Sequence, residues 1–177
     1  MQRQQRKYDE AGNQFRKQIV INPQDHYAHA NLGEMLRDQK KCAEAMPELE
    51  KALAIAPNKV DVLLAQGGCD LDLGNRARGL SELEQATSAS PAPNTWNSAA
   101  YIPAKRNIEL DLAEKWSDTC LIMESGRLRS VSLDHLTAAQ LNYVFSIAAY
   151  WDTRGWIYFL RDDNAKSSRM AAPVWRE

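Results

Sequence analysis

Residues 26–57 read HYAHANLGEMLRDQKKCAEAMPELEKALAIAP and contain two apolar stripes at helical spacing, followed by a proline. The first stripe is formed by Leu32, Gly33 and Leu36, and the second by Ala45, Leu49 and Ala52. Residues three and four apart lie on one face of a helix, so the pattern predicts two successive amphipathic helices. Pro57 ends the second helix because proline lacks an N–H and clashes with the preceding turn.

The end of this stretch recurs at a fixed interval along the chain. QIVINP ends at Pro23, ALAIAP at Pro57 and ATSASP at Pro91, which gives a period of 34 residues. A period of this length is typical of stacked helix–turn–helix units. A single helical pair leaves part of its apolar surface uncovered, so neighbouring pairs are expected to stack and share one continuous core.

On these residues the sequence resembles the tetratricopeptide repeat (TPR) family. The positions that carry the resemblance are Leu32, Gly33, Leu36, Ala45, Leu49, Ala52 and Pro57. The resemblance implies an all-α fold, a right-handed α-solenoid of about 4.5 TPR repeats with an insertion between the last two. We expect a single TPR domain over residues 1–177. Its parts are a partial repeat at 1–25, repeats at 26–59, 60–93 and 94–123, an insertion at 124–147 and a divergent repeat at 148–177.

Several residues depart from the repeat pattern, and each departure gives an expectation. Gly79 stands where the repeat usually has alanine, which is expected to loosen its helix by about 1 kcal/mol. Pro103 lies inside a predicted first helix and is expected to kink it. The insertion is expected to form a longer helix end, a loop and a short extra helix from Thr137. In the last repeat, Ser167 takes the close-packing position and Pro173 is expected to distort the second helix.

The aromatic run YWDTRGWIYFL at residues 150–160 presents two faces of one predicted helix. Trp151, Gly155 and Tyr158 match the packing stripe of the TPR pattern. Asp152, Trp156 and Phe159 share a second face, which in TPR arrays lines the concave groove that holds peptides or partner helices. Two alternatives stay open for Trp156: exposure on the groove wall, or burial under the inserted helix.

The resemblance therefore predicts a partner-binding groove. Its expected residues are Tyr27, Asn31, Glu34, Arg37, Asp38, Leu64, Leu71, Ile102, Asp152, Trp156 and Phe159. One TPR subgroup grips the C-terminal carboxylate of chaperones with a basic clamp, of which Asn31 matches one position. The other clamp positions hold Ala65, Asp61, Thr95 and Ala99, so the clamp is missing. The mixture of apolar side chains and both charge signs suits a mixed peptide or an amphipathic helix.

Sites of other kinds find little support in the sequence. A net charge of −1 argues against nucleic-acid binding, and no apolar run approaches the ~20 residues that span a bilayer. His26 and His29 are expected to be surface residues at a helix N-terminus, without a third metal ligand. Cys69 and Cys120 are expected to be small core residues, whereas Cys42 opens a helix, where the macrodipole favours a reactive thiolate. We expect no catalytic residue, no metal and no cofactor.

The favoured hypothesis is a non-catalytic interaction module that holds a protein or peptide partner. One alternative is the TPR tail of a larger bacterial enzyme, because residues 94–160 are similar to tails that follow a transglutaminase-like domain. Another is a self-assembling piece, with a homodimer formed through the incomplete N-terminal repeat. Free cysteines favour the cytoplasm. The cell envelope stays open if a leader or a further domain precedes the chain.

Overall fold

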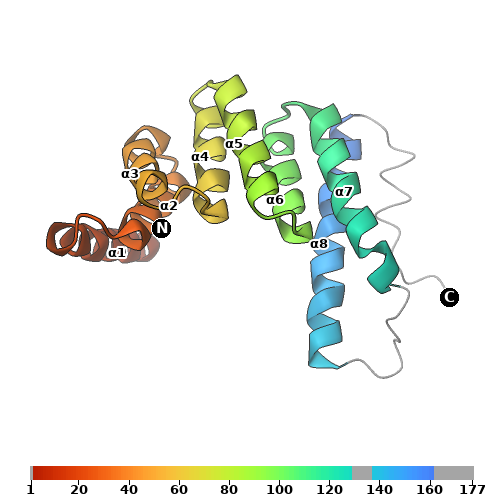
Figure 1. Ribbon diagram of the computed structural model, residues 1–177, viewed down its shortest axis with the longest axis horizontal. Helices are drawn as coiled ribbons and strands as arrows, with labels where there is room; N and C mark the ends of the chain where they lie inside the picture. The colour runs from red at the N-terminus through yellow and green to blue at the C-terminus, as the bar shows by residue number, and fades with distance from the viewer. Residues whose placement is uncertain (1, 129–136, 162–177) are drawn as a thin grey trace. The chain divides into compact units, whose positions relative to one another are not determined.

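The computed structural model describes residues 2–128 and 137–161, which form eight α-helices and contain no strand (Figure 1). The helices are α1 (Gln2–Ile21), α2 (His26–Asp38), α3 (Cys42–Ile55), α4 (Val60–Asp72), α5 (Arg76–Ala89), α6 (Pro93–Ala104), α7 (Leu110–Leu128) and α8 (Ala138–Leu160). Helices next to each other in the sequence pack against each other within each part of the chain. The expected all-α repeat fold is confirmed.

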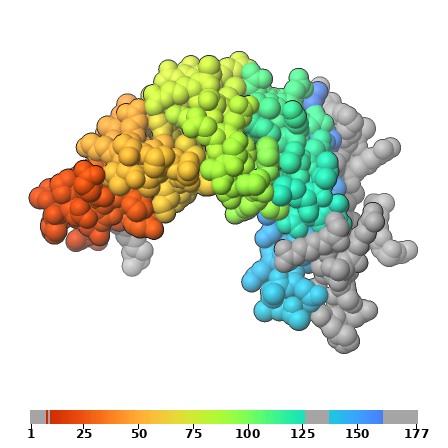
Figure 2. All heavy atoms as spheres, in the orientation of Figure 1, coloured from red at the N-terminus to blue at the C-terminus, as the bar shows by residue number. Residues whose placement is uncertain are grey.

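The chain divides into two compact units, which are described separately. The N-terminal unit covers Met1–Ala89 and the C-terminal unit covers Ser90–Glu177. Figure 2 shows side chains filling the space between the neighbouring helices of each unit.

The N-terminal unit is built around the two stripes that the sequence predicts. Leu49, Ala45 and Ala52 are completely buried, and the stripe of α2 is buried with them. From the other side, α1 covers this core with the partly buried side chains Tyr8, Ala11, Phe15 and Ile19. Asp25 caps α2 by accepting hydrogen bonds from the backbone N–H groups of Tyr27 (3.0 Å) and Ala28 (3.2 Å). The interpretation of residues 26–57 as a helix–turn–helix pair is confirmed.

Two glycines bring α4 and α5 into backbone contact. A Cβ added to Gly79 would lie 2.8 Å from the carbonyl oxygen of Gly67, and one added to Gly67 would lie 2.9 Å from that of Gly79. The expected propensity cost of Gly79 stays a prediction, and the structure adds a packing role for this glycine. The missing side chain is what lets the two helices approach this closely.

The described residues of the C-terminal unit form α6, α7 and α8, and α8 packs against both other helices. One part of its core is formed by Cys120, Tyr143, Ile147 and Tyr150, with Trp96, Leu121 and Trp151 packed around them. A second part is formed by Ala104, Ala113 and Ile157, with Leu110 beside them. At the start of α8, Thr137 and Gln140 form a capping box, which fixes where the helix begins. Trp151 and Tyr158 take part in packing, as the TPR pattern predicts. The expectation that Gly155 packs closely between them is wrong for the described residues, because none of them lies within 4 Å of where its Cβ would be.

Two expectations for this unit differ from the structure. Pro103 does not kink a continuing helix, because α6 ends at Ala104 and Pro103 lies buried in its last turn. The turn that follows contains Asn107 and Glu109 at positive φ, which leads the chain into α7. The short extra helix expected from Thr137 is also wrong as a separate element, since α8 runs without a break from Ala138 to Leu160. The expected extension of the preceding helix is confirmed, because α7 reaches Leu128. The expectations for Ser167 and Pro173 lie outside the described residues.

Candidate partner-binding surface

The predicted groove residues of the N-terminal unit lie on α2 and α4, two helices that contact each other. Tyr27, Asn31 and Asp38 are exposed on α2, and Glu34 and Arg37 are half-buried beside them. Leu64 on α4 is half-buried. Leu71 is only 5% exposed and packs against Gly79, so the prediction that it lines a groove is wrong.

Carboxylates concentrate at the junction of α2 and α4. Burial raises the pKa of Glu34, the neighbouring Arg37 opposes this rise, and the charges of Asp61 and Asp38 add to it. Asp61 lies in the first turn of α4. Its charge acts on Glu34 across the contact between α2 and α4. Arg37 is engaged by Asp38, with 3.0 Å between its guanidinium and Oδ1. Charges of both signs therefore act on Glu34, and burial is the main cause of its raised pKa.

Tyr27 provides an exposed aromatic surface next to these charges. Its side chain is 60% exposed. The ammonium group of Lys59 lies 4.5 Å from the ring centroid and 3.4 Å from the hydroxyl oxygen. Because this cation holds the ring from the α4 side, Tyr27 presents a positioned aromatic side chain to solvent. We call the surface of Tyr27, Asn31, Glu34, Arg37, Asp38, Asp61 and Leu64 the α2–α4 face.

The predicted groove residues of the C-terminal unit include an exposed aromatic pair. Trp156 and Phe159 on α8 stack with their centroids 5.4 Å apart, and they are 43% and 56% exposed. Asp152 is exposed one turn earlier, and Ile102 on α6 is half-buried. The alternative that the inserted helix buries Trp156 is wrong, because the stretch from Ala138 belongs to the same helix as Trp156.

The exposure of Trp156 leads to a fluorescence prediction. We expect acrylamide to quench a smaller fraction of the tryptophan emission in a Trp156→Phe variant than in the wild type. Trp116 is buried, so a Trp116→Phe variant serves as the matched control and should not lower the accessible fraction. An accessible fraction in Trp156→Phe that is not smaller than that of the wild type would show that Trp156 is covered in solution.

A charged cluster that the sequence reasoning missed joins α7 to α8. Arg154 is buried on α8, where one guanidinium N–H donates to the carbonyl oxygen of Glu114 at 2.7 Å. Its other terminal nitrogen lies 2.6 Å from Asp118 and 3.2 Å from the Glu114 carboxylate. The guanidinium carbon is 4.6 Å from the ring centroid of Tyr158. Arg161 pairs with Glu114 and Asp111 at the end of the same helix. The signal for this cluster in the sequence is Arg154, a basic residue inside the aromatic run at residues 150–160.

His29 and the three candidate cysteines are buried within the fold. His29 is buried, contrary to the expectation of a surface residue. Its Nδ1 lies 2.6 Å from Glu48 and its Nε2 lies 3.2 Å from the carbonyl oxygen of Pro23. It therefore connects α2 to α3 and to the preceding turn. Cys69 and Cys120 are buried in the core as predicted, and burial raises the pKa of both thiols, that of Cys120 to about 12.

Cys42 is also buried, with its sulfur 3.7 Å from Asp72. This burial argues against the reactive thiolate that its helix position suggested, because solvent and reagents have little access to the sulfur. Over residues 2–128 and 137–161, no three histidine, cysteine or acidic side chains lie together as a metal site.

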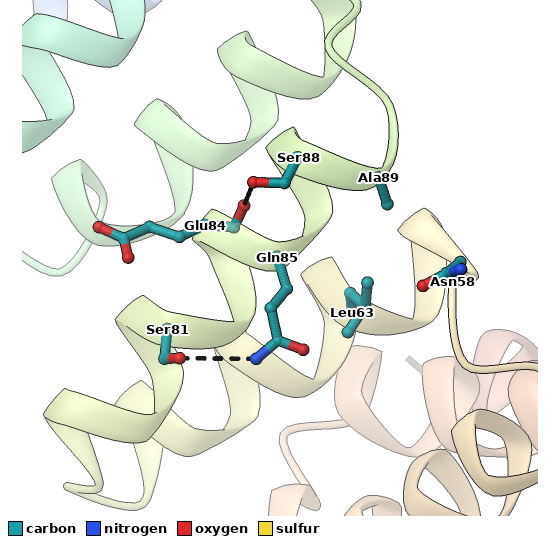
Figure 3. A pocket seen from close by; sticks show the side chains of 7 residues that line it. All are labelled: Asn58, Leu63, Ser81, Glu84, Gln85, Ser88 and Ala89. Carbon is teal, nitrogen blue, oxygen red and sulfur yellow. Dashed lines mark hydrogen bonds between the residues drawn. The ribbon is translucent and has the colours of Figure 1, made fainter.

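A shallow hollow of about 600 Å³ lies between α5 and the start of α4 (Figure 3). Its lining residues are Asn58, Leu63, Ser81, Glu84, Gln85, Ser88 and Ala89. Gln85 donates to Ser81 at 3.5 Å, and Ser88 donates to the carbonyl oxygen of Glu84 at 2.9 Å. Within this lining no nucleophile lies beside a general base, so the hollow has no catalytic geometry. None of the described helices is both long and apolar enough to cross a membrane.

Comparison with known proteins identifies the repeat. The sequence profile of the tetratricopeptide repeat matches residues 26–59. No curated protein matches the sequence. The fold is similar to the crystal structure of MamA protein, with a TM-score of 0.63 and 14% identity over 96% of this chain and 83% of that chain.

Two further crystal structures have a similar fold. PilW, described as a widely conserved type IV pilus biogenesis factor, gives a TM-score of 0.65 and 19% identity over 96% of this chain and 72% of PilW. A tetratricopeptide repeat protein from Parabacteroides merdae ATCC 43184 gives 0.54 and 15% identity over 92% of this chain and 70% of that protein. At these identities the similarity concerns the fold alone, and it agrees with the resemblance seen in the sequence.

Proposed function

We propose that this chain, a tetratricopeptide-repeat protein by its repeat at residues 26–59 and by its fold, is a non-catalytic module that binds a partner polypeptide along the α2–α4 face. The observation that carries the proposal is the set of exposed side chains on this face. Tyr27, Asn31 and Asp38 are exposed, although the positions beside them on α2 are buried in the repeat core. Packing of the repeat does not require these side chains.

The chemistry of the face suggests what kind of segment it binds. Tyr27 offers contact area with little loss of side-chain entropy. Burial raises the pKa of Glu34, and Asp61 and Asp38 add to the rise, although Arg37 opposes it. A lysine or arginine of the partner would stabilise the Glu34 carboxylate and pair with the acidic groups beside it. The face therefore suits a segment that carries an apolar residue beside a basic one.

The stacked pair of Trp156 and Phe159 is proposed as a second contact surface of the same kind, within the C-terminal unit. The comparisons do not favour the alternative that the chain is the tail of an enzyme.

Selection of peptides from a random library on the wild-type protein tests the α2–α4 face. We expect peptides enriched in lysine or arginine next to an apolar residue. Their binding should weaken about tenfold or more in Tyr27→Ala and in Glu34→Lys, because each variant removes one half of the recognition. Glu44→Lys, which makes the same charge change at an exposed position of α3, is the matched control. Equal binding by all three variants would contradict the proposal.

A further inference from the structure

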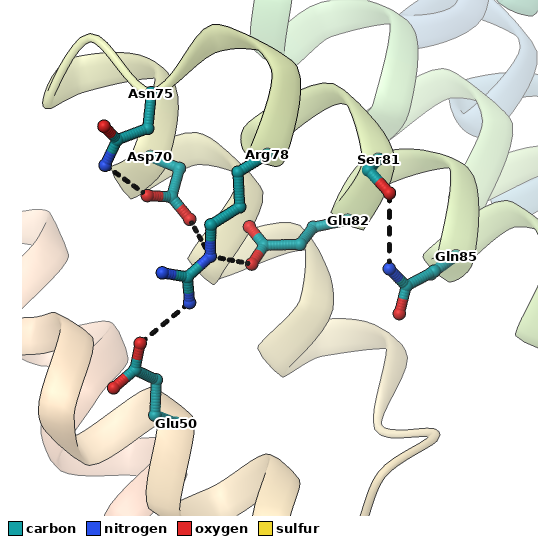
Figure 4. Close-up of polar contacts among 7 residues, drawn as sticks. All are labelled: Glu50, Asp70, Asn75, Arg78, Ser81, Glu82 and Gln85. Carbon is teal, nitrogen blue, oxygen red and sulfur yellow. Dashed lines mark hydrogen bonds and ion pairs between the residues drawn. The ribbon is translucent and has the colours of Figure 1, made fainter.

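The second full repeat contains a charged cluster between α3, α4 and α5 (Figure 4). Asp70 on α4 has no exposed surface, and Glu82 on α5 is buried beside it. Arg78, one turn before Glu82, places its guanidinium between the two carboxylates. Glu50 from α3 reaches the outer side of the same guanidinium. The cluster therefore brings three acidic groups to one cation.

Among the described residues, fewer hydrogen-bond donors reach the two buried carboxylates than these have oxygens. Asn75 donates to Oδ1 of Asp70 at 2.8 Å, and a terminal nitrogen of Arg78 donates to Glu50 at 2.7 Å. The Nε of Arg78 lies 3.1 Å from both Glu82 Oε1 and Asp70 Oδ2, but it carries one hydrogen, which it donates to Glu82. Among the described residues, Asp70 Oδ2 and Glu82 Oε2 are buried and receive no hydrogen bond.

Two buried carboxylate oxygens without a donor are costly, and so is the uncompensated negative charge. One proton removes both problems, because a neutral carboxyl supplies an O–H donor and lowers the charge of the cluster by one. We propose that Asp70 and Glu82 hold one proton between them in the folded state, and that its release weakens the pairing of α4 with α5. This shared proton goes beyond the proposed binding function and does not depend on it.

The electrostatics of Glu82 agree with the geometry. The pKa of Glu82 is raised from 4.5 to about 7, first by burial and then by the hydrogen bond and the charge of Asp70, while Arg78 opposes the rise. Asp70 from α4 and Arg78 from α5 are the charged groups that face Glu82, and Glu50 from α3 acts on it through Arg78. Because the pKa of Glu82 is higher in the folded state than in the unfolded chain, protonation of Glu82 stabilises the fold. This contribution is complete below the pKa of the unfolded chain. This stabilisation is lost as the pH rises through about 7.

Chemical unfolding followed by circular dichroism between about pH 5 and about pH 8 tests the proposal on the whole chain. We expect the folding equilibrium constant of the wild type to fall on the order of a hundredfold across this range. In Glu82→Gln, an amide N–H takes the place of the proton, so most of this fall should disappear. Glu84→Gln, at an exposed position on the same helix, is the matched control and should keep the wild-type dependence.

Carboxyl ¹³C NMR of the wild type provides a second test that does not depend on the folding of any variant. The Glu82 resonance is expected to titrate near neutral pH. Titration of Glu82 at its ordinary value of 4.5 would overturn the proposal, as would an unchanged pH dependence in a folded Glu82→Gln.

Discussion

Gly79→Ala is expected to destabilise the N-terminal unit by about 2–3 kcal/mol, although alanine is the better helix former by about 1 kcal/mol. The new Cβ would lie 2.8 Å from the carbonyl oxygen of Gly67 and 3.0 Å from Leu71. A flexible side chain would move away from such a contact. A backbone carbonyl inside α4 moves only if the two helices separate, and their separation also exposes the core around Leu83, which is completely buried.

The expected loss can be measured as a shift of the unfolding midpoint by circular dichroism, with Gly155→Ala as the matched control. Gly155 is also a helical glycine, but none of the described residues lies within 4 Å of where its Cβ would be. The same substitution there is expected to leave stability unchanged or to raise it by up to about 1 kcal/mol. If Gly79→Ala is as stable as the wild type, α4 and α5 are not in backbone contact in solution.

In this region the periodicity of the sequence predicts the helices but not the close contact between them. The period of 34 residues and the stripes around Leu32 and Leu49 predict the helical pairs correctly, because burial of apolar stripes is what these positions require. Periodicity does not show why one position holds glycine. Helix propensity alone makes Gly79 a defect, whereas its contact with Gly67, 12 residues earlier, depends on how α4 packs against α5.

The candidate binding surface was predicted in part for a related reason. The helical phase correctly places Tyr27, Asn31 and Asp38 on an exposed side of α2. It fails for Leu71, whose side chain occupies space that the missing side chain of Gly79 leaves free. In the sequence, Asp61 stands out only as a mismatch to the chaperone clamp. Its effect on Glu34 arises from contact between α2 and α4, which the sequence of either helix alone does not show.

The charged clusters were missed because they break the apolar pattern at buried positions. Gln66 and Asp70 lie one turn apart on the buried side of α4, where the repeat normally packs apolar residues. A polar residue at such a position needs partners from other helices. For Asp70 these partners are Asn75 and Arg78, and their convergence follows from the packing of α4 with α5.

Arg154→Ala is expected to destabilise the C-terminal unit by about 2–3 kcal/mol, because breaking a buried ion pair leaves its partners without a donor. The guanidinium donates a hydrogen bond to the Glu114 carbonyl oxygen at 2.7 Å and pairs with the Asp118 carboxylate at 2.6 Å. It also lies over the ring of Tyr158. Asp118 keeps access to water, which moderates the loss. All five tryptophans lie beyond residue 90, so their fluorescence reports the unfolding of this unit.

Two further variants separate the role of the fork-shaped guanidinium from that of its charge. Arg154→Lys keeps the cation but donates to fewer acceptors at once. We therefore expect its stability to lie between that of the wild type and that of Arg154→Ala. Arg161→Ala removes a partly exposed arginine that also pairs with Glu114, and it should cost less than about 1 kcal/mol because water screens such pairs. Equal losses for Arg154→Ala and Arg161→Ala would mean that burial of Arg154 contributes nothing. The α7–α8 pair would then be held mainly by its apolar contacts around Ile147 and Tyr150 and by the hydrogen bond from the Tyr143 hydroxyl to the carbonyl oxygen of Glu124.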